Sequence, residues 1–230
     1  MGQLIERLAP EAGFAVGLKL DIDSNEDQQG ITPENFRDID VAIEFSTPHV
    51  AVDNLVSLCA IGVPTVVGTT GWYGELARVK GFVDQSSAGV VYSANYSIGV
   101  NVFRRVVAEA ARLLANENEY GAWAWEIHHS AKKDAPSGTL LQLVEEMKHV
   151  GYSRQIDFSS NRAGANPGTH EIGFDSAADT ITLRHTARSR EGFARGALKA
   201  AQWVIGKRGL HEFAEVLFAD DAKVMRRPAD

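Results

Sequence analysis

The sequence predicts an α/β protein, in which a doubly wound, mainly parallel sheet is joined to a second, α+β domain with an open sheet. In the first half of the chain, short β-rich runs alternate with amphipathic stretches, as in βαβ units. Beyond about residue 120, strands with an alternating pattern surround a single helix, and the C-terminal part returns to helical periodicity. We therefore expect one domain over residues 1–97 and 191–230 and another over residues 98–190.

The first half of the chain is expected to contain four short strands connected by helices. Pro48 fits the first turn of one helix, because no backbone N–H is needed there. The chain opens on a helix, although a parallel pair needs a strand before its crossover helix. The expected strands are 15–21, 41–45, 64–67 and 90–92, and the expected helices are 2–12, 48–60 and about 73–84.

The second half begins with a clearly amphipathic helix. Phe103, Val107 and Leu114 lie on its apolar stripe, with charged residues outside it. The strands that follow alternate between two faces, and because they surround a single helix we expect an α+β domain with an open sheet. The expected helices are 101–115 and about 137–150, the expected strands are 121–129, 155–159, 169–174 and 180–185, and residues 192–216 are expected to be helical.

Composition excludes several classes of protein. The 230 residues carry a formal net charge of −7, which makes a general nucleic-acid binder unexpected. Cys59 is the single cysteine, so an internal disulfide framework and a Cys-built zinc site are excluded, and a reducing cytoplasm is expected. No apolar run is long enough for a bilayer, and no secretory signal pattern is present, so no membrane partner is expected.

The most specific motif in the sequence covers residues 126–139, which read Glu-Ile-His-His-Ser-Ala-Lys-Lys-Asp-Ala-Pro-Ser-Gly-Thr. Two imidazoles and two ammonium groups gather after a strand, and small hydroxyl residues then open a helix. Free N–H groups and the helix dipole favour a carboxylate or phosphate at such a helix start. Adjacent Lys and His side chains depress each other's pKa, which suits a general acid near neutral pH. Thr139 and Gln142 have the spacing of a capping box.

This run resembles the signature of the dihydrodipicolinate reductase family: a His-His pair, a Lys four residues after the first His, then Asp-Ala-Pro-Ser-Gly-Thr. The match has no gap, and the resemblance extends over nearly the whole chain. Residues 68–71, Gly-Thr-Thr-Gly, resemble the family's nicotinamide-side loop, and residues 93–101 resemble its domain-junction segment. Residues 162–164, Arg-Ala-Gly, and residues 184–190 resemble later family segments.

The resemblance implies a cytoplasmic enzyme of lysine and diaminopimelate biosynthesis that reduces a small dicarboxylate. A hydride would pass from NADH or NADPH to 4-hydroxy-tetrahydrodipicolinate or dihydrodipicolinate, giving tetrahydrodipicolinate. His128 would be the catalytic His and Lys132 the acid that delivers the proton. His129, Ser137, Gly138 and Thr139 would hold the substrate, with Gly138 and Thr139 on a carboxylate. The sheet of the second domain would carry the contacts of a homotetramer.

The resemblance also implies a Rossmann-like cofactor domain, of which the first strand is apparently missing. Gly2 resembles the end of the family's glycine-rich loop, and Asp21 is placed as the ribose-binding acid, with Asp23 as its competitor. No Arg or Lys directly follows Asp21, so NADH suits the site at least as well as NADPH. The residues implied to bind the cofactor are Gly2, Asp21, Gly68, Thr69, Thr70, Ser93, Ala94, Asn95 and Tyr96.

The missing strand leaves two explanations open. Met1 is either an internal Met of the family loop, with the true start upstream, or the chain has lost or weakened its cofactor site. The first is favoured because the other family motifs are intact, and the gene sequence upstream of Met1 decides between them. Such a strand would be central, so its absence would leave neighbouring backbone groups unpaired.

The sequence also leaves two alternative functions and several isolated histidines to consider. The alternative function is a non-catalytic homologue that binds anions or acts in assembly, and a third is a related imine reductase with another substrate. No metal site is expected, because His49, His149, His170 and His211 lack ligand spacing and packing is their default role. For His170, a place near Arg162 beside the substrate is the less favoured alternative.

Overall fold

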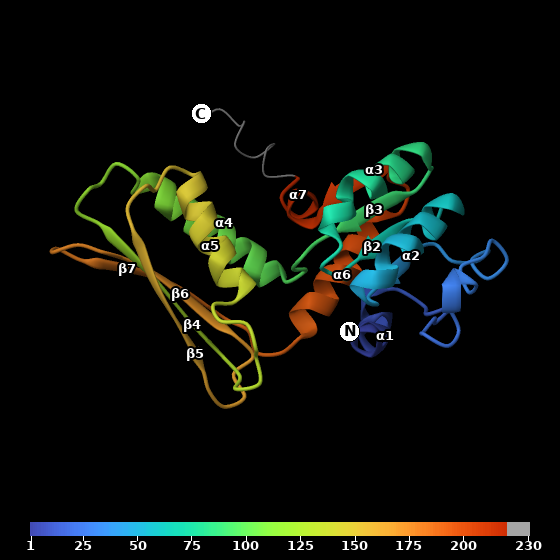
Figure 1. Cartoon of the computed structure of the whole chain (residues 1–230), viewed down its shortest axis with the longest axis horizontal. Coiled ribbons are helices and arrows are strands. Elements are labelled where there is room, and N and C mark those ends of the chain that lie inside the picture. The colour runs from blue at the N-terminus through green and yellow to red at the C-terminus, as the bar shows by residue number, and fades with distance from the viewer. Residues whose placement is uncertain (220–230) are drawn as a thin grey trace. The chain divides into compact units, whose positions relative to one another are not determined.

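The computed structural model describes residues 1–219, and the chain divides into two compact units. One unit comprises Met1–Ser97 together with the chain from Phe193 onward, and the other comprises Ile98–Gly192 (Figure 1). No helix in residues 1–219 has the length and apolar character needed to cross a bilayer.

The discontinuous unit is built on a four-stranded parallel sheet. Its strands are β1 (Ala42–Glu44), β2 (Thr65–Val67), β3 (Gly89–Tyr92) and β8 (Gly209–Glu212), in the order β1-β2-β3-β8, and each neighbouring pair is parallel. Val66 and Val91 face one core and Val67 and Val90 face another, because successive side chains point to opposite sides. Both faces of the sheet are thus buried, which is the arrangement that parallel sheets require.

Helices cover both faces of this sheet. α1 (Gly2–Leu8) and α6 (Glu191–Val204) supply apolar residues to one core, and α2 (Pro48–Ala60) and α3 (Leu76–Gln85) supply them to the other. Three short 3-10 turns, Pro10–Ala12, Glu26–Gln28 and Tyr73–Glu75, lie in the same unit, and α7 (Phe213–Leu217) follows β8. This is the doubly wound arrangement that the strand and helix alternation predicts, so the fold class is confirmed.

Two local predictions in this unit are wrong. Residues 15–21 form no strand, because no described segment pairs with them; Leu18 and Leu20 instead pack by their side chains beside Phe36. Within residues 1–219, β1 pairs only with β2 and so forms an edge of the sheet. Residues 209–212 are strand β8 and not helix, because they complete the sheet against β3; so short a strand has no periodic signal.

The contiguous unit packs two helices on one face of a mixed sheet. Its elements are α4 (Ile98–Leu113), β4 (Gly121–His128), α5 (Gly138–His149), β5 (Ile156–Arg162), β6 (Thr169–Asp175) and β7 (Thr180–Thr186). The strand order is β5-β4-β6-β7, in which β4 and β5 are parallel and the other pairs are antiparallel. Figure 1 shows α4 and α5 side by side over the sheet. The predicted open α+β sheet is confirmed.

The two faces of this sheet differ along β4. Ala122, Ala124, Glu126 and His128 are buried toward the helices, whereas the residues between them are only partly buried or exposed. Trp123 and Trp125 belong to the other face, where the Trp123 ring lies over Gly173 on β6. No helix of the described part of this unit covers that face (Figure 1).

Candidate functional site

Glu126 stands at the centre of a polar cluster on the helix-facing side of the contiguous unit. The strand register explains the cluster: Glu126 on β4 lies directly beside Ser160 on β5 and His170 on β6. His128, two residues along β4, lies beside Arg162 in the same way. Because neighbouring residues in register point to the same face, three strands bring these five side chains together.

The carboxylate of Glu126 has no exposed surface and accepts several hydrogen bonds. Oε1 accepts from the backbone N–H of Ser137 at 2.8 Å, from the Ser160 hydroxyl at 2.9 Å and from Nη2 of Arg162 at 2.9 Å. Oε2 accepts from the Ser137 hydroxyl. Burial alone would raise the pKa of Glu126, but the donors from Ser137, Arg162 and Ser160 outweigh burial and lower this pKa to about 2.

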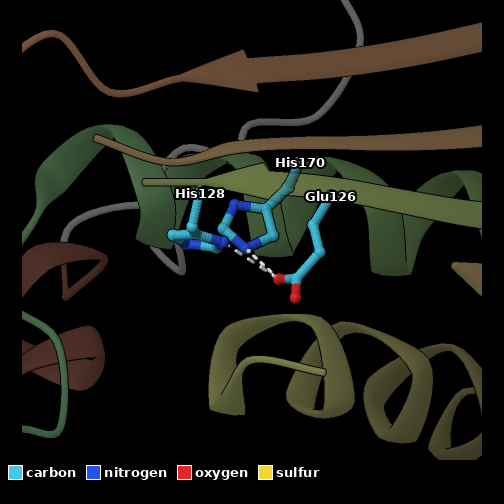
Figure 2. A group of neighbouring side chains, drawn as sticks. All are labelled: Glu126, His128 and His170. Carbon is cyan, nitrogen blue, oxygen red and sulfur yellow. Dashed lines mark ion pairs between the residues drawn. The ribbon is translucent and has the colours of Figure 1, made fainter. Parts of the chain in front are cut away.

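Two imidazoles face the second oxygen of the same carboxylate. Figure 2 shows the His128 and His170 rings directed toward Glu126; Nε2 of His170 lies 3.2 Å and Nδ1 of His128 lies 3.5 Å from Oε2. The rings meet edge to face with centroids 5.1 Å apart. Burial lowers the pKa of both, that of His170 to about 4, and Lys132 also lowers the pKa of His128. Both rings are therefore neutral at pH 7.

This placement bears on the expectation that the chain holds no metal. The donor atoms of Glu126, His128 and His170 all lie within 4.8 Å of one another, a spacing at which one ion would reach them all. The carboxylate, however, is already paired with the Arg162 guanidinium and holds further donors. A metal ion would add buried positive charge that Glu126, already balanced by Arg162, cannot neutralise, so this donor set fits a metal ion poorly.

Ser137 begins α5 and connects Glu126 to the start of that helix. As the N-cap residue, its hydroxyl accepts from the N–H of Leu140 at 3.2 Å. The predicted capping box of Thr139 and Gln142 is therefore wrong, because the helix begins two residues earlier than that spacing needs. Within residues 1–219 the N–H groups of Gly138 and Thr139 have no acceptor, and a Cβ added at Gly138 would meet no atom within 4 Å. The helix start is thus open to an anion.

The loop between β4 and α5 carries the remaining residues of the motif. The side chain of Lys132 is a quarter exposed, and its ammonium group lies 2.7 Å from the Asp134 carboxylate. Arg162 also donates to the backbone carbonyl of Asp134, which ties this loop to β5. His129 is exposed, and its carbonyl accepts from the N–H of Lys132. His128, Lys132, Ser137, Gly138 and Thr139 therefore belong to one unit, while within residues 1–219 the side chain of His129 makes no hydrogen bond or ion pair with the cluster.

The predicted cofactor residues of the other unit follow two neighbouring strands. Gly68, Thr69 and Thr70 come directly after β2, and Ser93, Ala94, Asn95 and Tyr96 come directly after β3. The carboxyl ends of parallel strands are where such sheets bind ligands. The Thr69 hydroxyl accepts from the Ser46 N–H at 2.7 Å. The Tyr96 hydroxyl lies 2.9 Å from the carbonyls of both Val67 and Val91, so its buried side chain joins the two strands.

Gly2 and Asp21 lie apart from those loops along the chain. Gly2 is the first residue of α1, with open space where a side chain would stand. The Oδ1 atom of Asp21 accepts from Ser24 and from the N–H of Asp23, and these bonds, chiefly from the Ser24 hydroxyl, lower the pKa of Asp21. Within the described residues its Oδ2 atom has no hydrogen-bond donor, so one carboxylate oxygen is left for a ligand.

Sequence reasoning assigned no role to Glu126 and Ser160, and it favoured packing for His170. The structure joins all three, so the less favoured reading of His170, beside Arg162, describes its surroundings better. One signal was present in the sequence. Glu126 occupies the same strand face as the apolar Ala122 and Ala124, and a carboxylate at such a position needs buried partners.

Comparisons with known proteins agree across the chain. Two family profiles match, one described as the N-terminus of dihydrodipicolinate reductase over residues 1–96 and one as its C-terminus over residues 99–217. A protein of Christiangramia forsetii named 4-hydroxy-tetrahydrodipicolinate reductase is 34% identical, covering 94% of this chain and 93% of its own. A protein of Methanoregula boonei with the same name is 39% identical, covering 77% and 74%.

A solved structure supports the fold. The dipicolinate-bound dihydrodipicolinate reductase of Paenisporosarcina superposes with a TM-score of 0.70, at 21% identity, covering 90% of this chain and 83% of that one.

Proposed function

The chain belongs to the dihydrodipicolinate reductase family, and from this premise we propose how its own residues carry out the family's reaction. It is an NAD(P)H-dependent oxidoreductase that forms tetrahydrodipicolinate from 4-hydroxy-tetrahydrodipicolinate or dihydrodipicolinate, in lysine and diaminopimelate biosynthesis. The cofactor supplies the hydride. The protein must bind a dicarboxylate and deliver a proton.

The start of α5 is the proposed carboxylate site. Gly138 and Thr139 offer N–H groups without an internal acceptor, and the helix dipole adds a partial positive charge. Lys132, His129 and Ser137 would complete the substrate contacts. The observation that carries the proposal is this pair of free N–H groups beside a fully buried, charge-paired carboxylate. The dipicolinate carried by the structural relative is itself a dicarboxylate, which supports the choice of ligand.

His128 and Lys132 are the proposed catalytic pair. Lys132 carries an ammonium proton in a partly exposed position, and delivery of that proton to the reduced substrate would make it the general acid. His128 is held by burial in its neutral form, so it adds an imidazole that can accept or donate a hydrogen bond without adding charge.

The loops after β2 and β3 are the proposed cofactor site, with Gly2 and Asp21. One buried acceptor there is unsatisfied: Oε2 of Glu44, at the end of β1, has no hydrogen-bond partner among the described residues. Such an atom fits the hydroxyl or amide donors that a nicotinamide nucleotide carries. We assign residues 1–97 and 191–230 to cofactor binding and residues 98–190 to substrate binding and assembly.

We propose a cytoplasmic homotetramer. The helix-free face of the β4–β7 sheet carries Trp123 and Trp125, only partly buried, and aromatic residues of this kind favour interfaces. The buried free thiol of Cys59 suits a reducing compartment.

The direct test mixes the chain with NADH or NADPH and freshly formed 4-hydroxy-tetrahydrodipicolinate, and follows loss of absorbance at 340 nm. Dipicolinate and NADH binding are measured separately by calorimetry and by fluorescence. Turnover supports the reductase. Dipicolinate binding without NADH binding or turnover would instead favour the anion-binding homologue.

A further inference from the structure

We infer that Glu126 is a positioning residue for substrate binding: it fixes Ser137 so that the start of α5 stays free for a substrate carboxylate. The inference rests on the proposed function, because it concerns the same dicarboxylate site. Glu126 touches no substrate in this scheme, since its side chain is wholly buried and its oxygens face protein donors.

Three hydrogen bonds of the Ser137 N–H and hydroxyl determine the beginning of α5, and the hydroxyl also lies 3.2 Å from Nε2 of His170. Its N–H and its hydroxyl both donate to Glu126, and its oxygen accepts from the N–H of Leu140. The Ser137 oxygen therefore caps the N–H of Leu140, while the Ser137 hydroxyl donates its proton to Glu126. The first helical N–H groups left without an internal acceptor are those of Gly138 and Thr139. The pair of Glu126 bonds thus selects which N–H groups remain for a ligand.

Three strands hold the Glu126 carboxylate in place. Ser160 and Arg162 contact it from β5, His170 from β6, and His128 from β4. A carboxylate with so many donors has little freedom to move, and its hydrogen bonds to charged or polar partners are individually strong. The rigid part of the site is therefore the sheet, and Glu126 transmits its position to the helix start.

Charge and position predict opposite outcomes when Glu126 is neutralised. Its negative charge repels a dicarboxylate, and Arg162 balances that charge at 2.9 Å. If Glu126 acted only through its charge, removing it would leave Arg162 unpaired and would tighten binding of a dianion. If Glu126 acts by fixing Ser137, the same change weakens binding. The two roles are distinguishable by the sign of the effect.

The experiment measures dipicolinate binding by calorimetry for the full chain and for Glu126→Gln, Glu126→Asp and Glu146→Gln. Glu146 is the matched control, because it also pairs with an arginine, Arg104, but lies near the other end of α5. We expect Glu126→Gln to weaken binding about tenfold, the loss of one charge-assisted bond. Glu126→Asp keeps the charge but shortens the side chain and should weaken binding as well. Glu146→Gln should bind as the unchanged chain does.

Equal or tighter dipicolinate binding by folded Glu126→Gln overturns the inference. Dipicolinate binding by Glu126→Asp that is as tight as that of the unchanged chain overturns it too. If neither Glu126 variant folds, as judged by circular dichroism, Ser160→Ala takes their place, with Ser159→Ala on the same strand as its control. Ser160→Ala removes one hydroxyl donor from Glu126 without changing the helix start, whereas Ser159 is exposed. Weaker dipicolinate binding by Ser160→Ala than by Ser159→Ala supports the inference, and unchanged or tighter binding by Ser160→Ala contradicts it. Failure of the unchanged chain to bind dipicolinate defeats the proposed substrate site and this inference together, whereas the outcomes above defeat only the inference.

Discussion

Gly168 lies against the imidazole of His128, so closely that a Cβ on Gly168 would stand 2.9 Å from Nε2. The backbone of Gly168 also has a φ of +143°, a conformation that side chains rarely adopt. The residue before β6 thus forms one wall of the space that the proposed catalytic His occupies.

Gly168→Ala should displace the His128 ring and lower kcat by about tenfold or more, because small misplacements of reacting groups are costly. Gly164→Ala is the matched control. It also has a positive φ, +56°, but no atom lies within 4 Å of the added Cβ. Turnover and thermal unfolding are measured for both. A kcat that falls equally in the two variants would assign the effect to backbone strain and not to His128.

Lys132→Ala should leave NADH binding intact and lower turnover by roughly 10²- to 10⁴-fold, the usual contribution of a general acid. The neighbouring Lys133→Ala removes an equal charge and serves as the comparison. NADH fluorescence titration and the 340 nm assay separate binding from chemistry. Normal turnover in Lys132→Ala would refute its role as the proton donor.

His170→Gln should reduce the loss of stability on acidification. Burial lowers the pKa of His170 from 6.5 to about 4, so the unfolded chain binds the proton first as the pH falls. The stability that the folded protein gains by holding this ring neutral is fully present above pH 6.5 and is lost between pH 6.5 and about pH 4. We expect the free energy of unfolding to fall by about 2 kcal/mol less in the variant between pH 7.5 and 5. Urea unfolding at both pH values checks this, and an unchanged difference would contradict it.

Some acid sensitivity should persist in that variant. Burial also lowers the pKa of His128 and of His185, and both therefore titrate with the same sign. The free energy of unfolding should therefore fall with pH in both proteins, but less steeply in His170→Gln.

Asp21→Asn should weaken NADH binding relative to NADPH binding by about tenfold, because the carboxylate accepts ribose hydroxyls and repels a 2′-phosphate. The asparagine retains Oδ1, which holds the Ser24 turn, and changes mainly the free oxygen. Asp23→Asn tests the competing residue. A shifted preference in Asp23→Asn alone would move the ribose contact to that position.

Trp125→Glu should dissociate the proposed tetramer, because a charge at the core of an apolar interface is strongly disfavoured. Trp125 lies on the helix-free face, where its indole N–H donates to Asn161. Phe82→Glu, at an exposed apolar residue of α3 in the other unit, is the control. Light scattering after size exclusion gives the masses; a Trp125→Glu protein of unchanged mass would exclude this face.

Local patterns predicted most elements, because periodicity and punctuating residues are properties of neighbouring positions. The helix at Pro48–Ala60 begins at the proline as expected. The same reasoning missed β8 and wrongly assigned a strand to residues 15–21, since membership of a sheet depends on a partner and not on the segment alone.

The site divides in the same way. The motif placed His128, Ser137, Gly138 and Thr139 near one another because they lie within a dozen residues or so. The approach of Ser160 and His170 to Glu126 depends on the registers of β4 with β5 and with β6. A shift of one residue in either register would turn those side chains to the opposite face, and no local pattern records it.

The division of the chain has a consequence for the order in which the protein is made. The contiguous unit lies wholly between the two parts of the other, whose core needs Ala197, Leu198 and Ala201 from α6. During translation, residues 98–192 leave the ribosome before those residues do. The contiguous unit can therefore fold first. Until β8 is available, the sheet of residues 1–97 is incomplete and its apolar residues stay exposed. A nascent chain arrested when residue 192 has just left the ribosome would hold the folded contiguous unit attached to an unfinished discontinuous unit.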